Sequence, residues 1–270
     1  MKRLSIYSAA CFTLLNLTAA QGQTSFEISF ANFVSSSDFD GTNSSVGSWY
    51  DGKEGLVFTS VFSDGTKSVG ATLAATSAYS PRNEGLNGTA GTNDVQINQR
   101  RDNSVSFTLS LFDEATGNLI DSSFLGGEYG YSLSFYDIDG IASEGLDQIT
   151  SYDHSSYLYL KDSLLDVTTS GNSVTATANG TINDIPNPSS STVTLTAAQE
   201  SAMIVFGFEN IAQADFTYTI VGGNSNTQRN AFIDGGDFTT FAGETIPEPT
   251  SALLIGLGSI ALLVHRGTRA

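Results

Sequence analysis

Four acidic side chains that lie close together in the sequence could bind a cation. Asp137 and Asp139 follow a stretch of alternating apolar residues, and Glu144 and Asp147 come shortly after them. Two carboxylates on one face at a strand end repel each other unless a cation or hydrogen-bond donors lie between them. Because Ca²⁺ takes about six to eight oxygen ligands of this kind, the pattern predicts a calcium site. The spacing differs from that of an EF-hand loop, and the alternative is a solvated acidic surface.

The same carboxylates could instead form a glycosidase pair, because hydrolysis of a glycosidic bond needs two carboxyl groups about 5 to 10 Å apart. No motif ties two of them to one cleft, so the sequence favours a protein without catalytic activity. Two weaker acidic segments, residues 38–41 and 234–237, could also bind calcium, and their alternative is turn formation alone.

Aromatic residues offer a second kind of chemistry, which is the stacking of a sugar ring on a flat apolar face. Trp49 and Tyr50 are adjacent, and Tyr152, Tyr157 and Tyr159 form a second group. Within that group, Tyr157 and Tyr159 share one face of a strand, which favours packing in the core. Trp49 and Tyr50 are therefore the predicted sugar-stacking pair.

The cysteine and histidine counts remove several other chemistries. The chain has one Cys and two His. Because Cys11 lies in the N-terminal apolar stretch, the remainder has no disulfide and no thiol nucleophile. A multi-histidine zinc site cannot be built, and a Ser-His-Asp triad has only His154 to use. We expect His154 to be a polar surface residue.

The charge balance excludes polyanionic partners. The chain has 11 Lys and Arg against 28 Asp and Glu, a formal net charge of −17. Residues 23–245 alone hold 7 of these bases and 27 of the acids, a net charge of −20. Such a domain repels phosphate backbones, so we expect no nucleic-acid partner.

Between the two ends of the chain, apolar and polar residues alternate with the period of a half-buried strand. Residues 202–208 are apolar at both odd and even positions, which predicts a central strand covered on both faces. Gly, Asp and Asn turns separate the segments, so we predict an all-β fold, an antiparallel, jelly-roll-like β-sandwich over residues 23–245. The alternating segments are residues 26–30, 105–111, 131–135, 174–177, 193–196 and 216–220.

Three Thr-x-Thr steps, at residues 175–177, 194–196 and 217–219, fall within these predicted strands. They are similar to the flat threonine arrays of ice-binding proteins. The steps lie far apart and show no fixed repeat, which is typical of ordinary strands, where Thr is enriched.

The N-terminus has the features of a secretory signal. Lys2 and Arg3 precede an apolar stretch over residues 4–17, and small residues follow it. This pattern predicts a helical signal peptide over residues 1–22 and export of the remainder. A lipoprotein signal ending at Cys11 is the alternative, although the apolar stretch before that Cys is short.

The C-terminal segment, residues 246–270, has three parts. Pro247, Glu248 and Pro249 precede an apolar run, and Arg266 and Arg269 follow it. A helix over residues 250–264 would be roughly 20 Å long, short of the roughly 30 Å hydrocarbon core. The segment therefore predicts a marginal transmembrane helix with its basic end in the cytoplasm. An ordinary single-pass anchor is the alternative.

This tail resembles the PEP-CTERM sorting signal of exported proteins from Gram-negative bacteria, although its basic cluster is thinner than is common. The resemblance implies recognition by an exosortase, cleavage near the Pro-Glu-Pro, and a transient inner-membrane tether before delivery to the cell surface or extracellular matrix. Tails of this type are also named after ice-binding proteins, a label that describes no activity. The expected function is that of a structural or binding protein, with exopolysaccharide as a partner. A carbohydrate-binding or polysaccharide-hydrolysing protein is the alternative.

Overall fold

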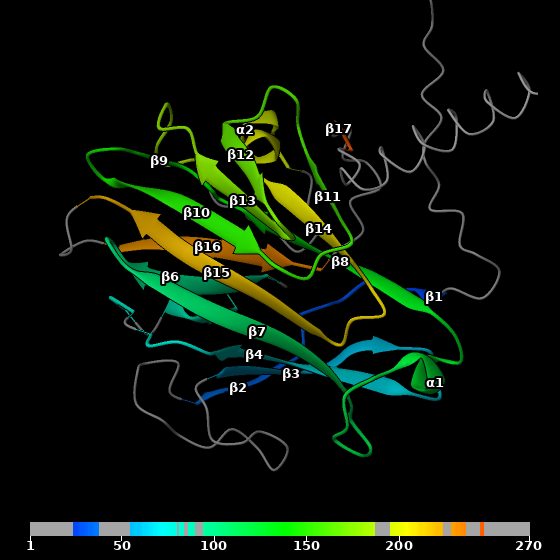
Figure 1. The fold of residues 1–270 in the computed structure, drawn as a ribbon. Coiled ribbons are helices and arrows are strands. Elements are labelled where there is room, and N and C mark those ends of the chain that lie inside the picture. Colours follow the sequence, from blue (N-terminus) through cyan, green and yellow to red (C-terminus); the bar gives the residue numbers. More distant parts are fainter. Residues whose placement is uncertain are drawn as a thin grey trace, which may run out of the picture.

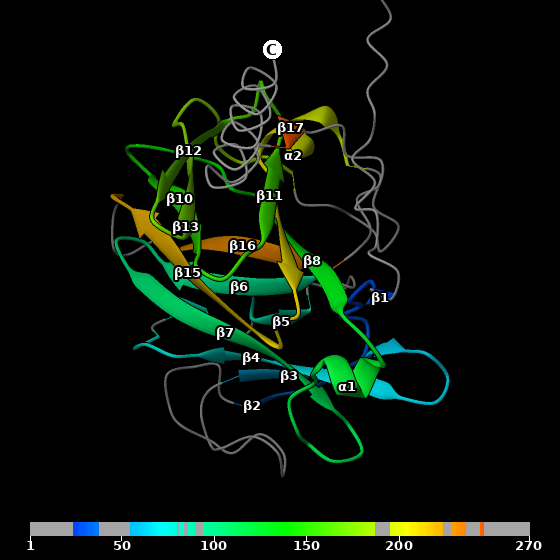
Figure 2. The same cartoon turned by 45° about the vertical axis from the view of Figure 1, so that its right-hand side comes forward.

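Four of the alternating segments, residues 105–111, 131–135, 174–177 and 216–220, lie in strands of two facing sheets, drawn in Figures 1 and 2. The prediction of a strand over residues 26–30 is wrong, because this segment forms only an isolated bridge between Ile28 and Gly235. The computed structural model describes residues 24–37, 55–79, 81–83, 86–89, 94–186, 195–223, 228–235 and 244–245. The predicted signal peptide, the predicted sugar-stacking pair Trp49 and Tyr50, and the whole predicted sorting tail lie outside the described residues.

The first sheet, here called the β8 sheet, has eight strands among the described residues. Their order is β17-β11-β14-β8-β16-β6-β5, and β1 pairs with β8 in parallel. The strands span Thr24–Ser25 (β1), Gly88–Thr89 (β5), Val95–Arg100 (β6), Tyr129–Tyr136 (β8), Ser156–Tyr159 (β11), Ile204–Glu209 (β14), Gln228–Asp234 (β16) and Glu244–Thr245 (β17).

The second sheet, here called the β15 sheet, has nine strands in the described part of the chain. Their order is β12-β13-β10-β15-β7-β4-β3-β2, and β9 pairs with β10. The strands span Phe33–Ser37 (β2), Gly55–Ser63 (β3), Ser68–Ala75 (β4), Ser104–Asp113 (β7), Gly140–Ile141 (β9), Gly145–Ser151 (β10), Leu165–Ser170 (β12), Ser173–Ala178 (β13) and Gln213–Val221 (β15).

Alternation along each strand decides which side chains enter the space between the sheets. In β7, Val105, Phe107 and Leu109 are buried, whereas the Ser and Thr residues between them are partly exposed. Strand β14 is apolar on both faces and packs apolar residues on both, as predicted for residues 202–208. The predicted two-layer antiparallel architecture is confirmed, and the jelly-roll connectivity stays a prediction.

Helices are short in this fold. Helix α1 spans Ser122–Leu125 and helix α2 spans Ala197–Ser201. The prediction of a strand over residues 193–196 is wrong at its described end, because Thr196 is the N-cap of α2 and forms a capping box with Gln199. No helix among the described residues is long and apolar enough to cross a membrane.

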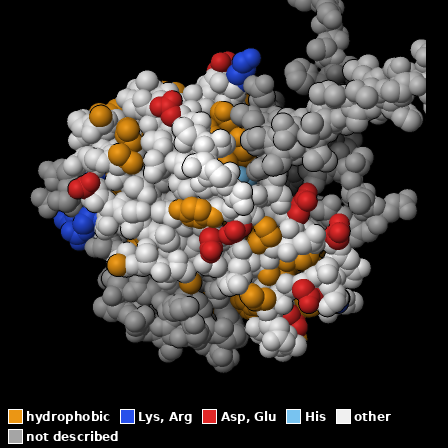
Figure 3. Space-filling view, in the orientation of Figure 1, with side chains coloured by type: hydrophobic (Ala, Val, Ile, Leu, Met, Phe, Trp, Pro, Cys, Tyr) orange, Lys and Arg blue, Asp and Glu red, His pale blue; other side chains and the backbone are white. Residues whose placement is uncertain are grey.

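The part of the β15 sheet formed by β10, β15 and β7 faces the viewer in Figure 3, whereas residues on both faces of β4 are buried. In Figure 1, which has the same orientation, strands β10, β15 and β7 lie in front of β16 and β6. Over these front strands most atoms are backbone or side chains that are neither charged nor apolar, with a few acidic groups between them. This face is therefore polar without being strongly charged.

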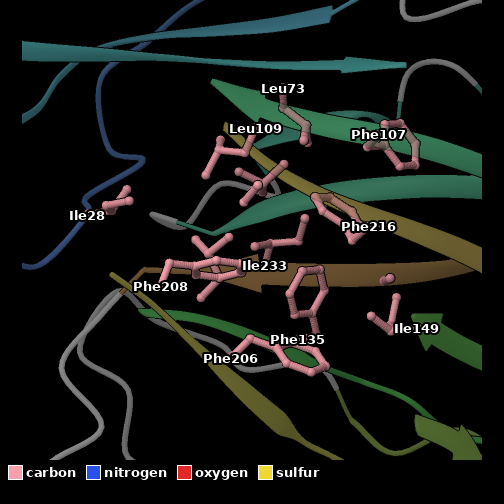
Figure 4. Packing of buried hydrophobic residues seen from close by; sticks show 14 of the residues in the cluster. Ile28, Leu73, Phe107, Leu109, Phe135, Ile149, Phe206, Phe208, Phe216 and Ile233 are labelled. Atoms are coloured by element: carbon pink, nitrogen blue, oxygen red, sulfur yellow. The ribbon is translucent and has the colours of Figure 1, made fainter. Parts of the chain in front are cut away.

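The core lies between the two sheets and is rich in aromatic rings. Figure 4 shows Phe135 and Phe206 of the β8 sheet beside Phe216 of the β15 sheet. The ring centroid of Phe135 is 4.9 Å from that of Phe216 and 5.8 Å from that of Phe206. Aromatic rings from both layers thus interdigitate, which fixes the two sheets relative to each other.

Candidate functional site

Two of the four predicted calcium ligands are brought together by the tight β9–β10 hairpin. Asp139 precedes β9 and Asp147 lies in β10, and the Asp147 N–H donates to the Asp139 carbonyl oxygen over 3.0 Å. Gly140 has a φ of +125°, and a Cβ there would lie 2.2 Å from the Gly145 carbonyl oxygen. Only glycine fits this corner, so the hairpin fixes the spacing of the two carboxylates.

Arg229 of β16 reaches across from the β8 sheet to both of these carboxylates. Its Nε donates to Asp147 Oδ2 over 2.7 Å, and its Nη2 contacts Asp139 Oδ1. The two carboxylates are 2% and 1% exposed as whole residues. Tyr218 donates to Asp147 Oδ1 over 2.7 Å, and the Ile185 N–H donates to Asp139 Oδ2 over 2.6 Å. The result is a buried, hydrogen-bonded ion pair that joins the two sheets.

Glu144 lies at the rim of the same cluster, where it is half-exposed. Its Oε2 is 3.3 Å from Arg101 Nη2 and accepts a 3.0 Å hydrogen bond from Asn183 Nδ2. Asn183 Oδ1 in turn accepts a 2.8 Å hydrogen bond from Arg229 Nη1. The rim pair is therefore linked to the buried pair through one asparagine.

Asp137, the fourth predicted ligand, does not continue the alternation of β8. Its φ is +63°, so the chain turns away from the strand at this residue. Burial raises the pKa of Asp137 to about 7, while Arg229 opposes this shift and Asp184 adds to it. Burial also raises the pKa of Asp147, and the hydrogen bond from Tyr218 opposes this shift. Burial lowers the pKa of Arg229 to about 10. Arg229 thus stays charged at neutral pH.

Arginine supplies the positive charge that the sequence analysis assigned to calcium. Within the described residues, no group of three or more His, Cys, Asp or Glu side chains is arranged to hold a metal ion. Calcium binding stays a prediction from the sequence. Asp139 and Asp147 are buried against one arginine, so this pair cannot reach a polysaccharide as a glycosidase pair would have to.

Arg229 was missed by the sequence analysis, although a signal for it exists. Arg229 has the same parity in β16 as Ala231 and Ile233, which are buried in the core. An arginine on the core face of a strand needs a buried acid as its partner. The position of Arg229 on the core face therefore indicates a buried ion pair. Its partner Asp147 lies 82 residues away in the chain and cannot be identified from local sequence.

The other described residues singled out in the sequence lie apart from the carboxylate cluster. His154 is buried, with its ring centroid 5.3 Å from that of Phe206, so the prediction of a surface residue is wrong. The ring centroid of Tyr157 lies 5.7 Å from that of His154. Tyr157 is in the core and Tyr159 packs partly against it, as predicted. Acidic residues 38–41 lie outside the described residues, whereas Asp234 is a buried residue at the end of β16.

A second candidate site is the outer face of the β15 sheet, which appears only when the strands are placed side by side. We call it the hydroxyl face. Cross-strand partners share a face, so the register of β7, β15, β10, β13 and β12 assembles one polar surface. Its side chains are Ser104, Ser106, Thr108, Ser110, Gln148, Thr150, Tyr152, Asp166, Thr168, Thr175, Thr177, Gln213, Asp215, Thr217 and Thr219. Leu146, Val221, Ser170 and Ser173 lie on the same side of the sheet, next to the hydroxyl face at the ends of the strands.

Two of the three Thr-x-Thr steps belong to this face. Residues 175–177 lie in β13 and residues 217–219 in β15, on either side of β10. The steps that looked isolated along the chain are therefore one strand apart in space. The third step begins outside the described residues, and its Thr196 caps α2 instead.

Comparisons with known proteins yield no family. No family model matches the chain, and no curated protein matches it. Among solved structures, the N-terminal domain of a Streptococcus gordonii adhesin aligns at 12% identity and a TM-score of 0.42, over 69% of this chain. The glucan binding protein C of Streptococcus mutans aligns at 14% identity and a TM-score of 0.35, also over 69%. The chain spans only 49% and 61% of the lengths of these two structures.

Proposed function

We propose that this chain is an exported, surface-sorted binding protein of the cell envelope or extracellular matrix, without catalytic activity. The hydroxyl face is the observation that carries the proposal. It presents hydroxyl, amide and carboxylate groups from five neighbouring strands on the open side of the sheet. Partly exposed polar groups held on the strands of a sheet are suited to recognition, because binding them costs little further ordering.

The carboxylate cluster has a structural role in this proposal. Arg229 pairs with the carboxylates of Asp139 and Asp147, which are both buried, so these three residues join the two sheets. Polysaccharide hydrolysis, the alternative from the sequence, would need two accessible carboxyl groups beside a bound sugar. This pair does not provide them.

The route to the surface in this proposal rests on the two ends of the chain. Residues 1–22 direct export, residues 250–264 tether the protein transiently to the inner membrane, and an exosortase cleaves near Pro247, Glu248 and Pro249. The absence of cysteine after Cys11 fits an oxidising compartment, since no thiol can mispair there. The processed protein then resides at the cell surface or in the extracellular matrix.

Intact-mass measurement of the protein in each cell fraction tests this route. We expect the surface and matrix fractions to contain a form that lacks both the signal peptide and the residues after the Pro-Glu-Pro. A variant with Pro247→Ala and Pro249→Ala should stay full length, because the recognised motif is gone. Full-length wild-type protein found permanently in the inner membrane would contradict the proposal.

A further inference from the structure

The hydroxyl face is organised in rows of cross-strand neighbours. One row consists of Ser106, Thr217, Thr150, Thr175 and Thr168, from β7 to β12. The next row consists of Ser104, Thr219, Gln148, Thr177 and Asp166. Neighbouring strands are about 4.8 Å apart, so each row of five strands is roughly 19 Å long. This length suits a polymer of several repeating units.

Side chains within the rows hold one another in place. The hydroxyl oxygens of Ser104 and Thr219 are 2.8 Å apart, and those of Thr150 and Thr175 are 2.9 Å apart. Gln148 Nε2 donates to Thr177 Oγ1 over 2.8 Å. A hydroxyl group has one donor and two acceptor positions, so each keeps hydrogen-bonding capacity after pairing with its neighbour. A ligand would therefore meet donors and acceptors whose positions are already fixed.

Tyr152 adds a flat apolar surface to this polar array. It is 43% exposed, and its hydroxyl oxygen is 3.1 Å from Thr217 Oγ1. The neighbouring Asp215 on β15 is exposed and accepts a hydrogen bond from Thr108 Oγ1. An aromatic ring beside hydroxyl and carboxylate groups combines apolar contact with directional hydrogen bonds. A sugar ring, with apolar C–H faces and a rim of hydroxyl groups, matches both features.

The composition of the face decides between classes of ligand. The face contains no Lys or Arg, its charged residues are Asp166 and Asp215, and residues 23–245 have a net charge of −20. An anionic polymer would be repelled. Protein interfaces are enriched in aromatic residues, Met and Arg and depleted in Ser, whereas this face is dominated by Ser and Thr. An uncharged polymer of hydroxylated units fits better than either.

We infer that the hydroxyl face binds an uncharged polysaccharide, with the sugar chain lying along the two rows and one ring against Tyr152. The inference rests on the proposed function and names the ligand class of that binding surface. It concerns only the described strands, and it is independent of how the tail is processed.

Affinity electrophoresis of the processed protein tests the inference. The gels contain the neutral or the anionic fraction of the extracellular polysaccharide of the producing cells, or dextran or hydroxyethyl cellulose as neutral standards. We expect at least one neutral polymer to retard the protein and the anionic fraction to have no effect. Retardation by the anionic fraction alone, or by no neutral polymer, would overturn the inference.

Variants locate the binding surface in the same gels. The double variant Thr150→Val with Thr217→Val keeps the β-branched shape but removes two hydroxyl groups, and Tyr152→Ala removes the ring. Each should weaken binding at least tenfold with an unchanged melting temperature. Thr169→Val is the matched control, because Thr169 is exposed on β12 but lies outside the hydroxyl face. Equal binding by all variants would also overturn the inference.

The two proposals fail in different ways. In one outcome the wild-type protein reaches the matrix, variants of the hydroxyl face are released from the matrix, and no neutral polymer retards the protein. The ligand class is then wrong, and the proposed function stands. If wild-type protein stays full length in the inner membrane, the proposed function fails, and the same electrophoresis with the detergent-extracted full-length protein still decides the ligand class.

Discussion

Replacing Arg229 by Met is expected to lower the free energy of unfolding by about 3–5 kcal/mol, because it removes one partner of a buried ion pair. Asp139 and Asp147 would remain 2% and 1% exposed without their shared counter-charge. For a domain of this size the loss corresponds to a fall in melting temperature of roughly 10 °C. Thermal and urea unfolding of the variant and the parent measure it.

A matched control uses the rim of the same cluster. Glu144 is half-exposed and pairs with Arg101, so Glu144→Gln should cost less than about 1 kcal/mol. The loss of unfolding free energy caused by Arg229→Met should also become smaller in acid, where the unpaired carboxyl groups of Asp139 and Asp147 become protonated. Equal effects of the two substitutions would show that the buried pair does not hold the sheets together.

Asp137→Asn is expected to remove a pH dependence from the stability of the protein. The pKa of Asp137 is raised from 3.8 to about 7 in the fold, so the native state binds the proton more tightly than the unfolded state. Stability contributed by this group is therefore present at low pH and is lost as the pH rises from about 4 to about 7, by on the order of 3–4 kcal/mol. An asparagine cannot ionise, so the stability of the variant relative to the parent should increase as the pH rises from about 4 to about 7.

The backbone permits this substitution. Asp137 has a φ of +63°, and asparagine tolerates the left-handed region as well as aspartate does. Asp102→Asn is the control, because Asp102 has a φ of +58° but its side chain is exposed. Urea unfolding at several pH values between 4 and 8 should show the gain only for Asp137→Asn. Parallel stability curves for the parent and Asp137→Asn would mean that the carboxyl group is solvated in the fold.

Local patterns were sufficient to predict β7, β8, β13, β14 and β15 but not the order of the strands within the sheets. Strand β7 was visible as an alternation, and so was β15, yet the two are about a hundred residues apart in the chain and adjacent in the sheet. Parity shows that a side chain points outward, whereas the lateral order of strands depends on contacts throughout the core. The hydroxyl face could therefore not be assembled from the sequence.

The carboxylate cluster illustrates the same limit. The residues were identified because acids at a strand end need a positive partner, and that argument was sound. In the structure, Arg229 approaches these carboxylates from the other sheet, and nothing near Asp139 in the sequence indicates this contact. Likewise, the capping box at Thr196 and Gln199 is a sequence signal that strand-like alternation obscured.

The most direct test of the central claim is oxidative footprinting of the processed protein, with and without the neutral polysaccharide, read by mass spectrometry. Tyr152 and Val221 are 43% and 42% exposed and lie on the outer side of the β15 sheet, whereas Leu119 and Ile182 are 47% and 43% exposed elsewhere. If the hydroxyl face binds the polymer, labelling of Tyr152 and Val221 falls while that of Leu119 and Ile182 is unchanged. Unchanged labelling of Tyr152, or protection confined to Leu119 and Ile182, would contradict the account.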